Sequence, residues 1–306
     1  MTSAFGPGKV ILLGEHAVVY GAQAIAGALE RGVTAEAVPA PRCRLQVPQG
    51  ISALVRKQLR CAFDAAAEAT GRPPVEVRLT SDLPISMGLG SSAALSVAVS
   101  RVLAEASGER PSRRRLGDIA HAMERCFHGT PSGLDHACSL SAGLISYRKA
   151  PGREHGSATL LSPSVPLELA ILLVGARRPA RTTIAELRVR KERWPERYAR
   201  IFREIGRISA EGREAIEEGM LEGLGDAMNV NHGLLSALGL SSSALDAAVH
   251  GLRQAGALGA KLTGAGGDGG AVVGLFSSRK QAERAVVRSG LPGFTSTLTG
   301  REAARR

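Results

Sequence analysis

The segment Asp82–Ala106, DLPISMGLGSSAALSVAVSRVLAEA, places a run of glycine and serine directly before an alanine-rich apolar stretch. Gly88 and Gly90 let the backbone turn its N–H groups inward, and a helix that begins near Ser91 adds its positive end. We therefore expect this loop to bind an anion. Ser91 and Ser92 fit two roles, capping the helix or reaching a metal that is bound to phosphate, and two adjacent serines allow both.

Two common nucleotide-binding motifs fit this loop poorly. Gly88 to Ala93 formally match G-x-G-x-x-A, the dinucleotide fingerprint, which needs its first glycine at the end of a strand. Here Ser81–Met87 intervene after the predicted strand. A Walker A motif fails because no lysine follows the glycines. A phosphate loop without its own lysine needs a cation from elsewhere, and Lys9 beside Gly8 is the leading candidate.

Strand and helix patterns alternate along the whole chain. Apolar spacing predicts helices over Ile51–Gly71 and Ser112–Gly129 and strands over Pro73–Pro84 and Pro166–Ala176. Residues 182–256 are mainly helical in pattern, with expected breaks near Gly223, Gly225 and Gly239. The fold class is therefore α+β or α/β.

The length of the chain predicts two lobes. Its 306 residues exceed the size at which a single core usually suffices. Serine and proline gather at Ser157–Pro166, which indicates a boundary there. We expect an N-terminal lobe over residues 1–160 and a C-terminal lobe over residues 161–306.

The segment MERCFHGTPSGLDHACS, Met123–Ser139, contains two carboxylates. Glu124 lies in the last turns of a predicted helix, where a carboxylate opposes the helix dipole and gains no local benefit. Asp135 follows a Thr-Pro-Ser-Gly turn that would fix its direction. In phosphoryl transfer, one carboxylate commonly holds a divalent cation and another receives the hydroxyl proton. The alternative is that both are plain surface charges.

A zinc site is a further alternative on the same helix. His121, Glu124 and His128 share one helical face by their spacing. Three ligands on a single helix rarely surround one ion well, and the H-E-x-x-H pattern is absent from the sequence. This interpretation is therefore disfavoured.

A second glycine-rich loop occurs in KLTGAGGDGGAVVGL, Lys261–Leu275, and runs into a predicted strand. Its glycines permit a tight turn in which two backbones pack closely. They equally permit a backbone that approaches a ligand.

The formal net charge of +11 raises nucleic acid as a partner, because clustered Lys and Arg release counterions from phosphates. The basic residues fall in short bursts at Arg110–Arg115, Gly175–Arg181 and Arg188–Trp194, without interleaved aromatic residues. A solvated face is the better interpretation, and a basic rim around a site for an anionic substrate also fits. We expect no nucleic-acid partner.

The cysteines and the N-terminal segment indicate a reducing compartment. Cys43, Cys61, Cys126 and Cys138 include no C-x-x-C pair, so free thiols are expected. The first residues lack a basic region before the apolar run Val10–Leu13, and no stretch has the length of a membrane span. We expect a cytoplasmic protein with no membrane partner.

Taken in order, three motifs resemble those of the GHMP small-molecule kinases. They are a P-G-K strand motif at Pro7–Lys9, the P-x-x-x-G-L-G-S-S-A-A loop at Pro84–Ala94 and the last glycine-rich loop. The resemblance extends from Pro7 to Leu275. Within this superfamily, PGKVILLGEHAVVYG and ERCFHGTPSGLDH look most like the mevalonate kinases, and phosphomevalonate kinases are the nearest competitor.

The resemblance implies a two-lobed α+β fold, with an N-terminal lobe like domain 2 of ribosomal protein S5 and an α/β C-terminal lobe. It also implies ATP as co-substrate, mevalonate as acceptor and, by family habit, a homodimer. Ser92 and Glu124 would bind Mg²⁺ between the ATP phosphates. Asp135 would accept the proton of the acceptor hydroxyl, and Lys9 would stabilise charge and tune Asp135. The loop that wraps the phosphates would consist of Gly88, Leu89, Gly90, Ser91, Ser92 and Ala93.

The resemblance also implies acceptor-binding residues and shows three departures. Glu15 and His16 would help to bind mevalonate, and Thr182 and Thr183 would reach towards the substrate or phosphate. The departures from the usual family residues are His136, Leu95 and Asp268. None removes a group that the chemistry needs, but Leu95 makes the acceptor pocket more apolar.

Overall fold

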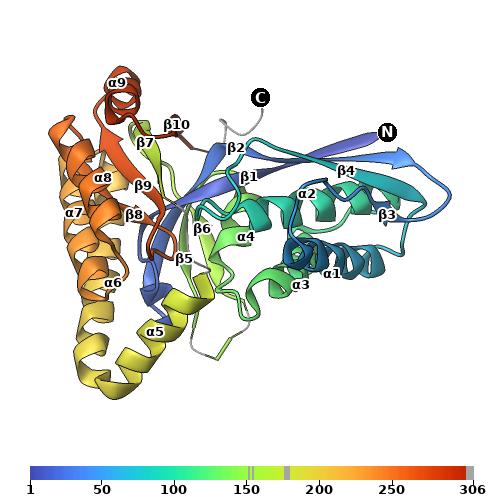
Figure 1. Cartoon of the computed structure of the whole chain (residues 1–306), viewed down its shortest axis with the longest axis horizontal. Helices are drawn as coiled ribbons and strands as arrows, with labels where there is room; N and C mark the ends of the chain where they lie inside the picture. The colour runs from blue at the N-terminus through green and yellow to red at the C-terminus, as the bar shows by residue number, and fades with distance from the viewer. Residues whose placement is uncertain (151, 154, 176–179, 301–306) are drawn as a thin grey trace. The chain divides into compact units, whose positions relative to one another are not determined.

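The computed structural model describes residues 1–150, 152–153, 155–175 and 180–300, which form two compact units interleaved along the chain (Figure 1). Unit 1 contains Met1–Lys9, Arg31–Ile85 and Gly90–Ala142. Unit 2 contains Val10–Glu30, Ser86–Leu89 and the described residues from Gly143 onwards. The two compact units have other boundaries than the two expected lobes, residues 1–160 and 161–306. The division into these lobes stays a prediction.

Two long strands contribute to both units. They are β1 (Thr2–Leu13) and β2 (Gln23–Pro39), which pair with each other. The other elements of unit 1 are β3 (Arg44–Leu45), α1 (Ala53–Ala69), β4 (Val75–Ser81), α2 (Ser91–Ala106), α3 (Arg113–His128) and α4 (Leu134–Ser141).

Unit 1 is a strand layer covered by packed helices. The second half of β2 pairs antiparallel with β4, and β3 pairs with β4 in parallel. Helix α2 packs on α1, α3 and α4. It also lies directly against β1, since a Cβ atom at Gly6 would be 2.0 Å from the Ala94 carbonyl oxygen. This close packing places the N-terminal turn of α2 beside β1.

The predicted helices of unit 1 are confirmed, and their caps explain where they begin. The side chain of Ser52 accepts a hydrogen bond from the Val55 amide at the start of α1. Ser112 does the same for the Arg115 amide at the start of α3. Each cap satisfies one of the amides that the first helical turn leaves without a partner.

Unit 2 is an antiparallel sheet with helices. Its strands β7 (Leu167–Val174), β8 (Gly259–Thr263), β9 (Gly270–Phe276) and β10 (Gly293–Leu298) have the order β10-β7-β9-β8. The first half of β2 pairs with β5 (Leu144–Arg148), and β5 pairs with β6 (Ser157–Leu160). The helical elements are η1 (Ala17–Tyr20), α5 (Ala180–Arg193), α6 (Pro195–Glu218), α7 (Leu221–Ala237), α8 (Ser243–Gln254) and α9 (Arg279–Ser289).

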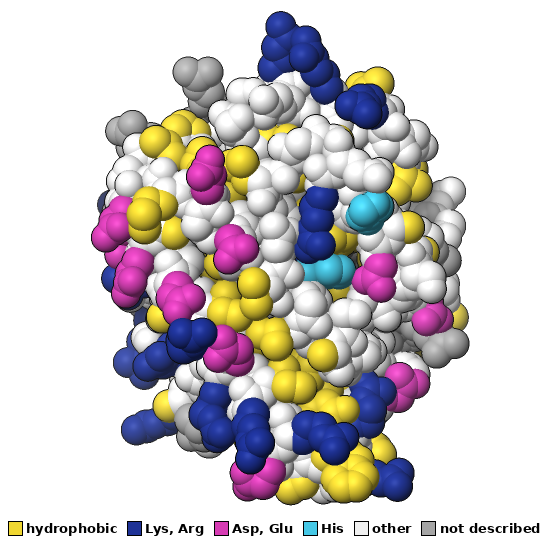
Figure 2. Space-filling view, turned by 90° about the vertical axis from the view of Figure 1, so that its left-hand side faces the viewer, with side chains coloured by type: hydrophobic (Ala, Val, Ile, Leu, Met, Phe, Trp, Pro, Cys, Tyr) yellow, Lys and Arg dark blue, Asp and Glu magenta, His cyan; other side chains and the backbone are white. Residues whose placement is uncertain are grey.

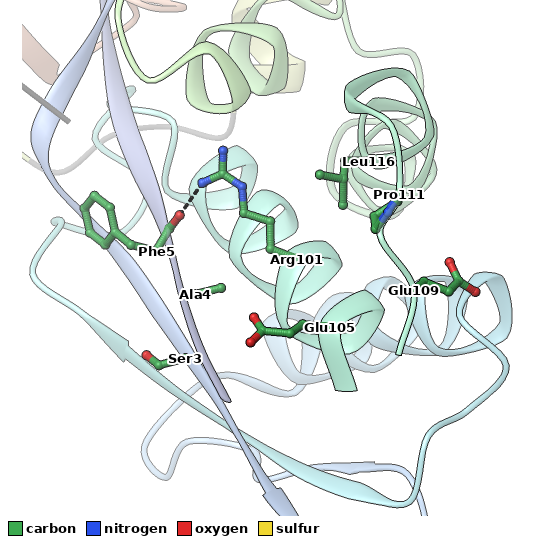
Figure 3. A pocket seen from close by; sticks show the side chains of 8 residues that line it. All are labelled: Ser3, Ala4, Phe5, Arg101, Glu105, Glu109, Pro111 and Leu116. Atoms are coloured by element: carbon green, nitrogen blue, oxygen red, sulfur yellow. Dashed lines mark hydrogen bonds between the residues drawn. The ribbon is translucent and has the colours of Figure 1, made fainter. Parts of the chain in front are cut away.

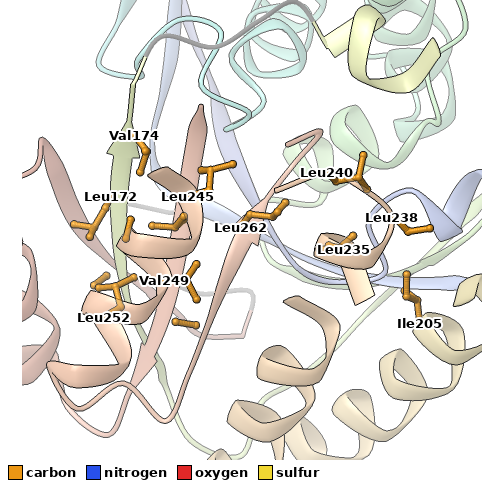
Figure 4. Close-up of a cluster of buried hydrophobic side chains, with 14 of the residues drawn as sticks. Leu172, Val174, Ile205, Leu235, Leu238, Leu240, Leu245, Val249, Leu252 and Leu262 are labelled. Carbon is orange, nitrogen blue, oxygen red and sulfur yellow. The ribbon is translucent and has the colours of Figure 1, made fainter. Parts of the chain in front are cut away.

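The core of unit 2 forms where the helices meet this sheet. Leu172 and Val174 of β7 and Leu262 of β8 pack with leucines of α7 and α8 in a buried cluster (Figure 4). Aliphatic side chains make up nearly all of it, as the scarcity of aromatic residues predicts.

Two expected helix breaks in unit 2 were wrong. Gly223 and Gly225 lie inside α7, and the chain instead leaves α6 at Gly219, whose φ of 75° is left-handed. At Gly225 a Cβ atom would lie 2.6 Å from the Leu258 carbonyl carbon. This glycine therefore lets α7 approach the chain just before β8, and it does not end the helix.

The expectation of free thiols was wrong for two cysteines. Cys61 of α1 and Cys126 of α3 form a disulfide across a sequence separation of 65 residues. Cys43 and Cys138 take no part in this disulfide. The sequence could not show the pairing, because each cysteine lies on a different helix and the two become neighbours only when α1 packs on α3.

We predict that the Cys61→Ser variant unfolds more easily than the wild type. A cross-link over a loop of this length limits the unfolded chain, and its loss costs about 2–4 kcal/mol of unfolding free energy. Urea denaturation under oxidising conditions measures the difference, with the Cys43→Ser variant as the control that keeps the disulfide. Equal midpoints for the two variants would show that the bond contributes nothing to stability.

Within the described part of the chain, no helix combines the length and the apolar character that a bilayer crossing requires.

Candidate active site

An ion pair joins β1 to the start of α4 in unit 1. Lys9 Nζ lies 3.4 Å from Asp135 Oδ1, and the side chains of Lys9 and Asp135 are 3% and 31% exposed. Asp135 stands in the first turn of α4, and the chain enters this helix through Gly133, whose φ is 91°. The structure therefore brings together two residues that lie 126 positions apart in sequence, one buried and one within reach of solvent.

Gly90 makes room for the stem of this lysine. It has a φ of 73° at the start of α2, a conformation that favours glycine. A Cβ atom there would lie 2.7 Å from Lys9 Cγ. The absence of a side chain at Gly90 thus leaves space for the Lys9 side chain and also permits the turn of the loop.

We predict that Gly90→Ala lowers kcat by about 10-fold or more, because small displacements of a reacting group carry large rate costs. The new methyl group must push the Lys9 stem aside. Gly108→Ala is the matched control, since Gly108 has a φ of 77° but a Cβ atom at this position would meet nothing within 4 Å. Equal kcat values for the two variants would contradict a specific role of Gly90 beside Lys9.

Glu124 lies near this pair as a fully buried carboxyl group. It is 1% exposed, so the interpretation as a surface charge is excluded for this residue. Burial, followed by the charge of Asp135, raises the pKa of Glu124 to about 8, while the Ser92 hydroxyl, the charge of Lys9 and the Ser96 hydroxyl act to lower it. Its Oε1 atom has no hydrogen-bond partner among the described residues. A buried carboxyl oxygen of this kind is suited to receive a cation.

Ser92 lies in the first turn of α2, close to Glu124 of α3. Its Oγ atom is 3.0 Å from His128 Nε2, and His128 Nε2 is 3.9 Å from Glu124 Oε2. Within the described residues no side chain caps α2, whose N-cap is Gly90. The capping role considered for Ser91 and Ser92 is therefore not observed, and the first-turn amides can face an anion.

The alternative zinc ligands have different neighbours. The His121 ring packs edge-on against His136, with 5.1 Å between centroids, while His128 reaches Ser92. His136, one of the departures from the family pattern, is thus a buried packing partner of His121.

A second polar cluster lies inside unit 2, around Glu15. Lys261 of β8 is completely buried and forms an ion pair with Glu15 Oε1. Asn231 Nδ2 of α7 donates to Glu15 Oε2 at 3.1 Å. Lys261 also donates to the Leu262 carbonyl oxygen at 2.6 Å. Both oxygens of Glu15 are therefore engaged within the protein.

His16 follows Glu15 and turns towards the last glycine-rich loop. It has a φ of 60°, which is unusual for a residue other than glycine, and its Nε2 atom lies 3.2 Å from the Ala265 carbonyl oxygen. Thr183 is buried, and a Cβ atom at Gly267 would lie 2.9 Å from its Oγ1 atom. Unit 2 thus gathers His16 and Thr183 around one loop.

Other glycines of that loop allow close backbone packing. A Cβ atom at Gly266 would lie 2.1 Å from the Leu240 carbonyl oxygen, and one at Gly264 would lie 3.0 Å from the Gly88 carbonyl oxygen. The tight-packing interpretation is therefore confirmed at these two positions.

Three other residues named in the sequence analysis differ in exposure. Thr182 is exposed on α5, Asp268 is exposed in the last glycine-rich loop, and Leu89 of the phosphate loop is buried.

A pocket of about 410 Å³ in unit 1 contains none of the predicted site residues (Figure 3). Arg101 crosses it and donates to the Phe5 carbonyl oxygen at 2.6 Å, with Glu105 and Glu109 along its wall. The Arg101 hydrogen bond thus links α2 to β1.

Some arginines of α5 and α6 pair with acidic residues on their own helix, as Arg188 does with Glu192 in α5. Arg207 contacts Glu204 and Glu211, and Arg213 contacts Glu217. On the face drawn in Figure 2, Lys and Arg side chains gather towards the lower edge with acidic side chains among them. These helical pairs are typical of a solvated face. Residues 176–179 of the second basic burst lie outside the described residues.

Sequence reasoning missed Lys261, Asn231 and the contact of His128 with Ser92. Lys261 stands between the apolar residues Ala260 and Leu262 in β8, a strand that was not predicted from the sequence, and a lysine so placed is a usable signal for a buried cation. Nothing in the sequence marks Asn231, because its partner Glu15 lies 216 residues away.

Comparison with known proteins assigns the chain to a family. Residues 54–143 match the family described as GHMP kinases N terminal domain, and residues 213–288 match GHMP kinases C terminal. The mevalonate kinase of Pyrococcus furiosus is 33% identical, over 97% of this chain and 95% of the relative. That of Aeropyrum pernix is 34% identical, over 99% and 97%. The chain belongs to the mevalonate kinase family.

A solved structure supports the same assignment. The L. major mevalonate kinase in complex with R-mevalonate has a TM-score of 0.87 and 29% identity, covering 98% of this chain and 96% of that chain. As a member of the mevalonate kinase family, the chain is an ATP-dependent small-molecule kinase with the α+β fold of GHMP kinases. The fold class and the family predicted from the three motifs are confirmed.

Proposed function

We propose that this kinase transfers the γ-phosphoryl group of ATP to the 5-hydroxyl of (R)-mevalonate. The observation that carries the proposal is the Lys9–Asp135 pair beside the buried Glu124, on a chain that is about one-third identical to curated mevalonate kinases over nearly its whole length. The L. major relative that shares the fold is described in complex with R-mevalonate.

In the proposed reaction Asp135 accepts the proton of the acceptor hydroxyl. The hydroxyl oxygen forms a bond to the γ-phosphorus, the bond between that phosphorus and the bridging oxygen breaks, and ADP leaves with the electron pair. Lys9 holds the Asp135 carboxylate in place and stabilises negative charge that develops on the transferred group. The exposed fraction of Asp135 allows an acceptor to reach it.

The phosphate loop comprises Gly88 to Ala93. The amides of the first turn of α2 would bind the ATP phosphates, since α2 has Gly90 as its N-cap and no side-chain cap among the described residues. Ser92 and Glu124 fit Mg²⁺, because a hydroxyl and a carboxylate are hard oxygen donors and Glu124 Oε1 is buried without a partner among the described residues. The cation would neutralise charge on the phosphates.

The acceptor-binding residues remain proposals. His16 and the threonines Thr182 and Thr183 would contact mevalonate or the transferred phosphate. Glu15 would act through the turn that precedes His16, because its own oxygens bind Lys261 and Asn231.

A coupled ADP-release assay with a panel of acceptors tests the function. With Mg-ATP, we expect (R)-mevalonate to give the highest kcat/KM, above phosphomevalonate, galactose and homoserine. Turnover of phosphomevalonate with mevalonate untouched would instead identify a phosphomevalonate kinase. Salt-dependent binding to nucleic acid, unaffected by ATP, together with no turnover of any acceptor would favour the nucleic-acid hypothesis.

The quaternary state and the compartment are proposals of the same origin. A homodimer rests on family habit, and analytical ultracentrifugation tests it. A cytoplasmic location rests on the same resemblance to the mevalonate kinases, and fractionation of the source cells tests it.

A further inference from the structure

We propose that His128 is a positioning residue for the metal site. His128 accepts the hydroxyl hydrogen of Ser92 and so directs the oxygen of Ser92 towards the cation. The inference rests on the proposed function, in which Ser92 and Glu124 hold the cation. It concerns a residue for which the motif comparison implied no role.

The contact between the two side chains has hydrogen-bond geometry. Ser92 Oγ lies 3.0 Å from His128 Nε2. A serine hydroxyl has one hydrogen and two lone pairs. If Nε2 accepts the hydrogen, both lone pairs remain available to a cation. In the opposite arrangement Nε2–H would donate to Ser92 and occupy one of them.

Two contacts hold His128 in this place. It is the last residue of α3, and Cys126 in the same turn is joined to Cys61 of α1. The neighbouring Phe127 carbonyl oxygen accepts a hydrogen bond from Gln58 Nε2 of α1 at 3.3 Å. The last turn of α3 is thus fixed to α1 through the two residues that precede His128.

The position of Glu124 one helical turn earlier completes the arrangement. His128 Nε2 lies 3.9 Å from Glu124 Oε2, while Glu124 Oε1 has no partner among the described residues. One helix therefore supplies a carboxylate that can ligate directly and an imidazole that contacts the second oxygen ligand. Partners that orient metal ligands in this way commonly change metal affinity by about 10–100-fold when removed.

A metal titration tests the inference without using turnover. Mn²⁺, which electron paramagnetic resonance detects, is titrated into protein with a non-hydrolysable ATP analogue, and binding to the analogue alone is subtracted. We expect His128→Ala to weaken Mn²⁺ binding by about 10-fold, and His128→Gln, whose amide oxygen can accept the hydrogen, to recover most of the affinity. His250→Ala, at an exposed histidine of α8, is the control and should bind like the wild type.

The Ser92→Ala background distinguishes positioning from direct ligation. If His128 acts through Ser92, adding His128→Ala to Ser92→Ala changes the Mn²⁺ affinity by less than about two-fold. An undiminished loss in that background would mean that His128 binds the cation itself, and would overturn the inference. Wild-type affinity in His128→Ala would overturn it as well. His128 is 43% exposed, so the variants are expected to fold, and their circular dichroism should match the wild type. A wild type that binds no Mn²⁺ with the analogue would contradict the proposed function itself.

Discussion

The Asp135→Asn variant is expected to bind ATP normally and to lose about 10²–10⁴-fold in kcat. The amide side chain keeps the size of the carboxyl group but cannot take up the proton of the acceptor hydroxyl. It also removes the negative partner of Lys9, whose Nζ lies 3.4 Å from the carboxylate. Steady-state kinetics give the loss in turnover, and fluorescence titration with a nucleotide analogue shows whether ATP binding survives.

Asp64→Asn is the matched control for this experiment. Asp64 is a 62%-exposed carboxylate of α1 that pairs with Arg72 at the surface, so its loss should leave kcat close to the wild-type value. If Asp135→Asn also retains activity within a few-fold of the wild type, Asp135 is not the general base.

The Lys261→Met variant is expected to lose about 3–5 kcal/mol of unfolding free energy, because it leaves the buried carboxylate of Glu15 without its cation. Lys261 is completely buried and Glu15 is 1% exposed, so water cannot replace the missing partner. Chemical denaturation measures the loss. Lys280→Met, at an exposed lysine of α9, is the control and should change stability little.

The double variant Glu15→Gln with Lys261→Met separates charge from packing. It removes both charges, so we expect it to be clearly more stable than Lys261→Met alone. This comparison remains measurable even if the single variant does not fold. A double variant that is less stable than Lys261→Met would show that Glu15 does not need Lys261 for charge compensation.

The sequence predicts much of the fold because the relevant signals are local. The helix from Ser112 is marked by its cap and its closing glycine, and the structure has α3 over Arg113–His128. The breaks expected at Gly223 and Gly225 were wrong because the packing of α7 against Leu258 overrides the low helix propensity of glycine. Tertiary contact decides such positions, and a single sequence does not show it.

The candidate site likewise contains some residues that the sequence predicts and others that it does not. Lys9, Ser92, Glu124 and Asp135 could be selected because each belongs to a short motif, and the structure places them as neighbours within unit 1. The disulfide and the buried partners of Glu15 depend on contacts between distant segments. Glu15 and Lys261, for example, have a sequence separation of 246. No local pattern records those distances.

The identity of the product tests the central claim most directly. Purified protein is incubated with (R)-mevalonate and Mg-ATP, and the product is analysed by phosphorus and proton NMR spectroscopy. We predict one phosphate ester, coupled to the methylene protons of the carbon that carried the primary hydroxyl, together with ADP in equal amount. Recovery of unchanged mevalonate, or a phosphate on the tertiary hydroxyl, would contradict the account.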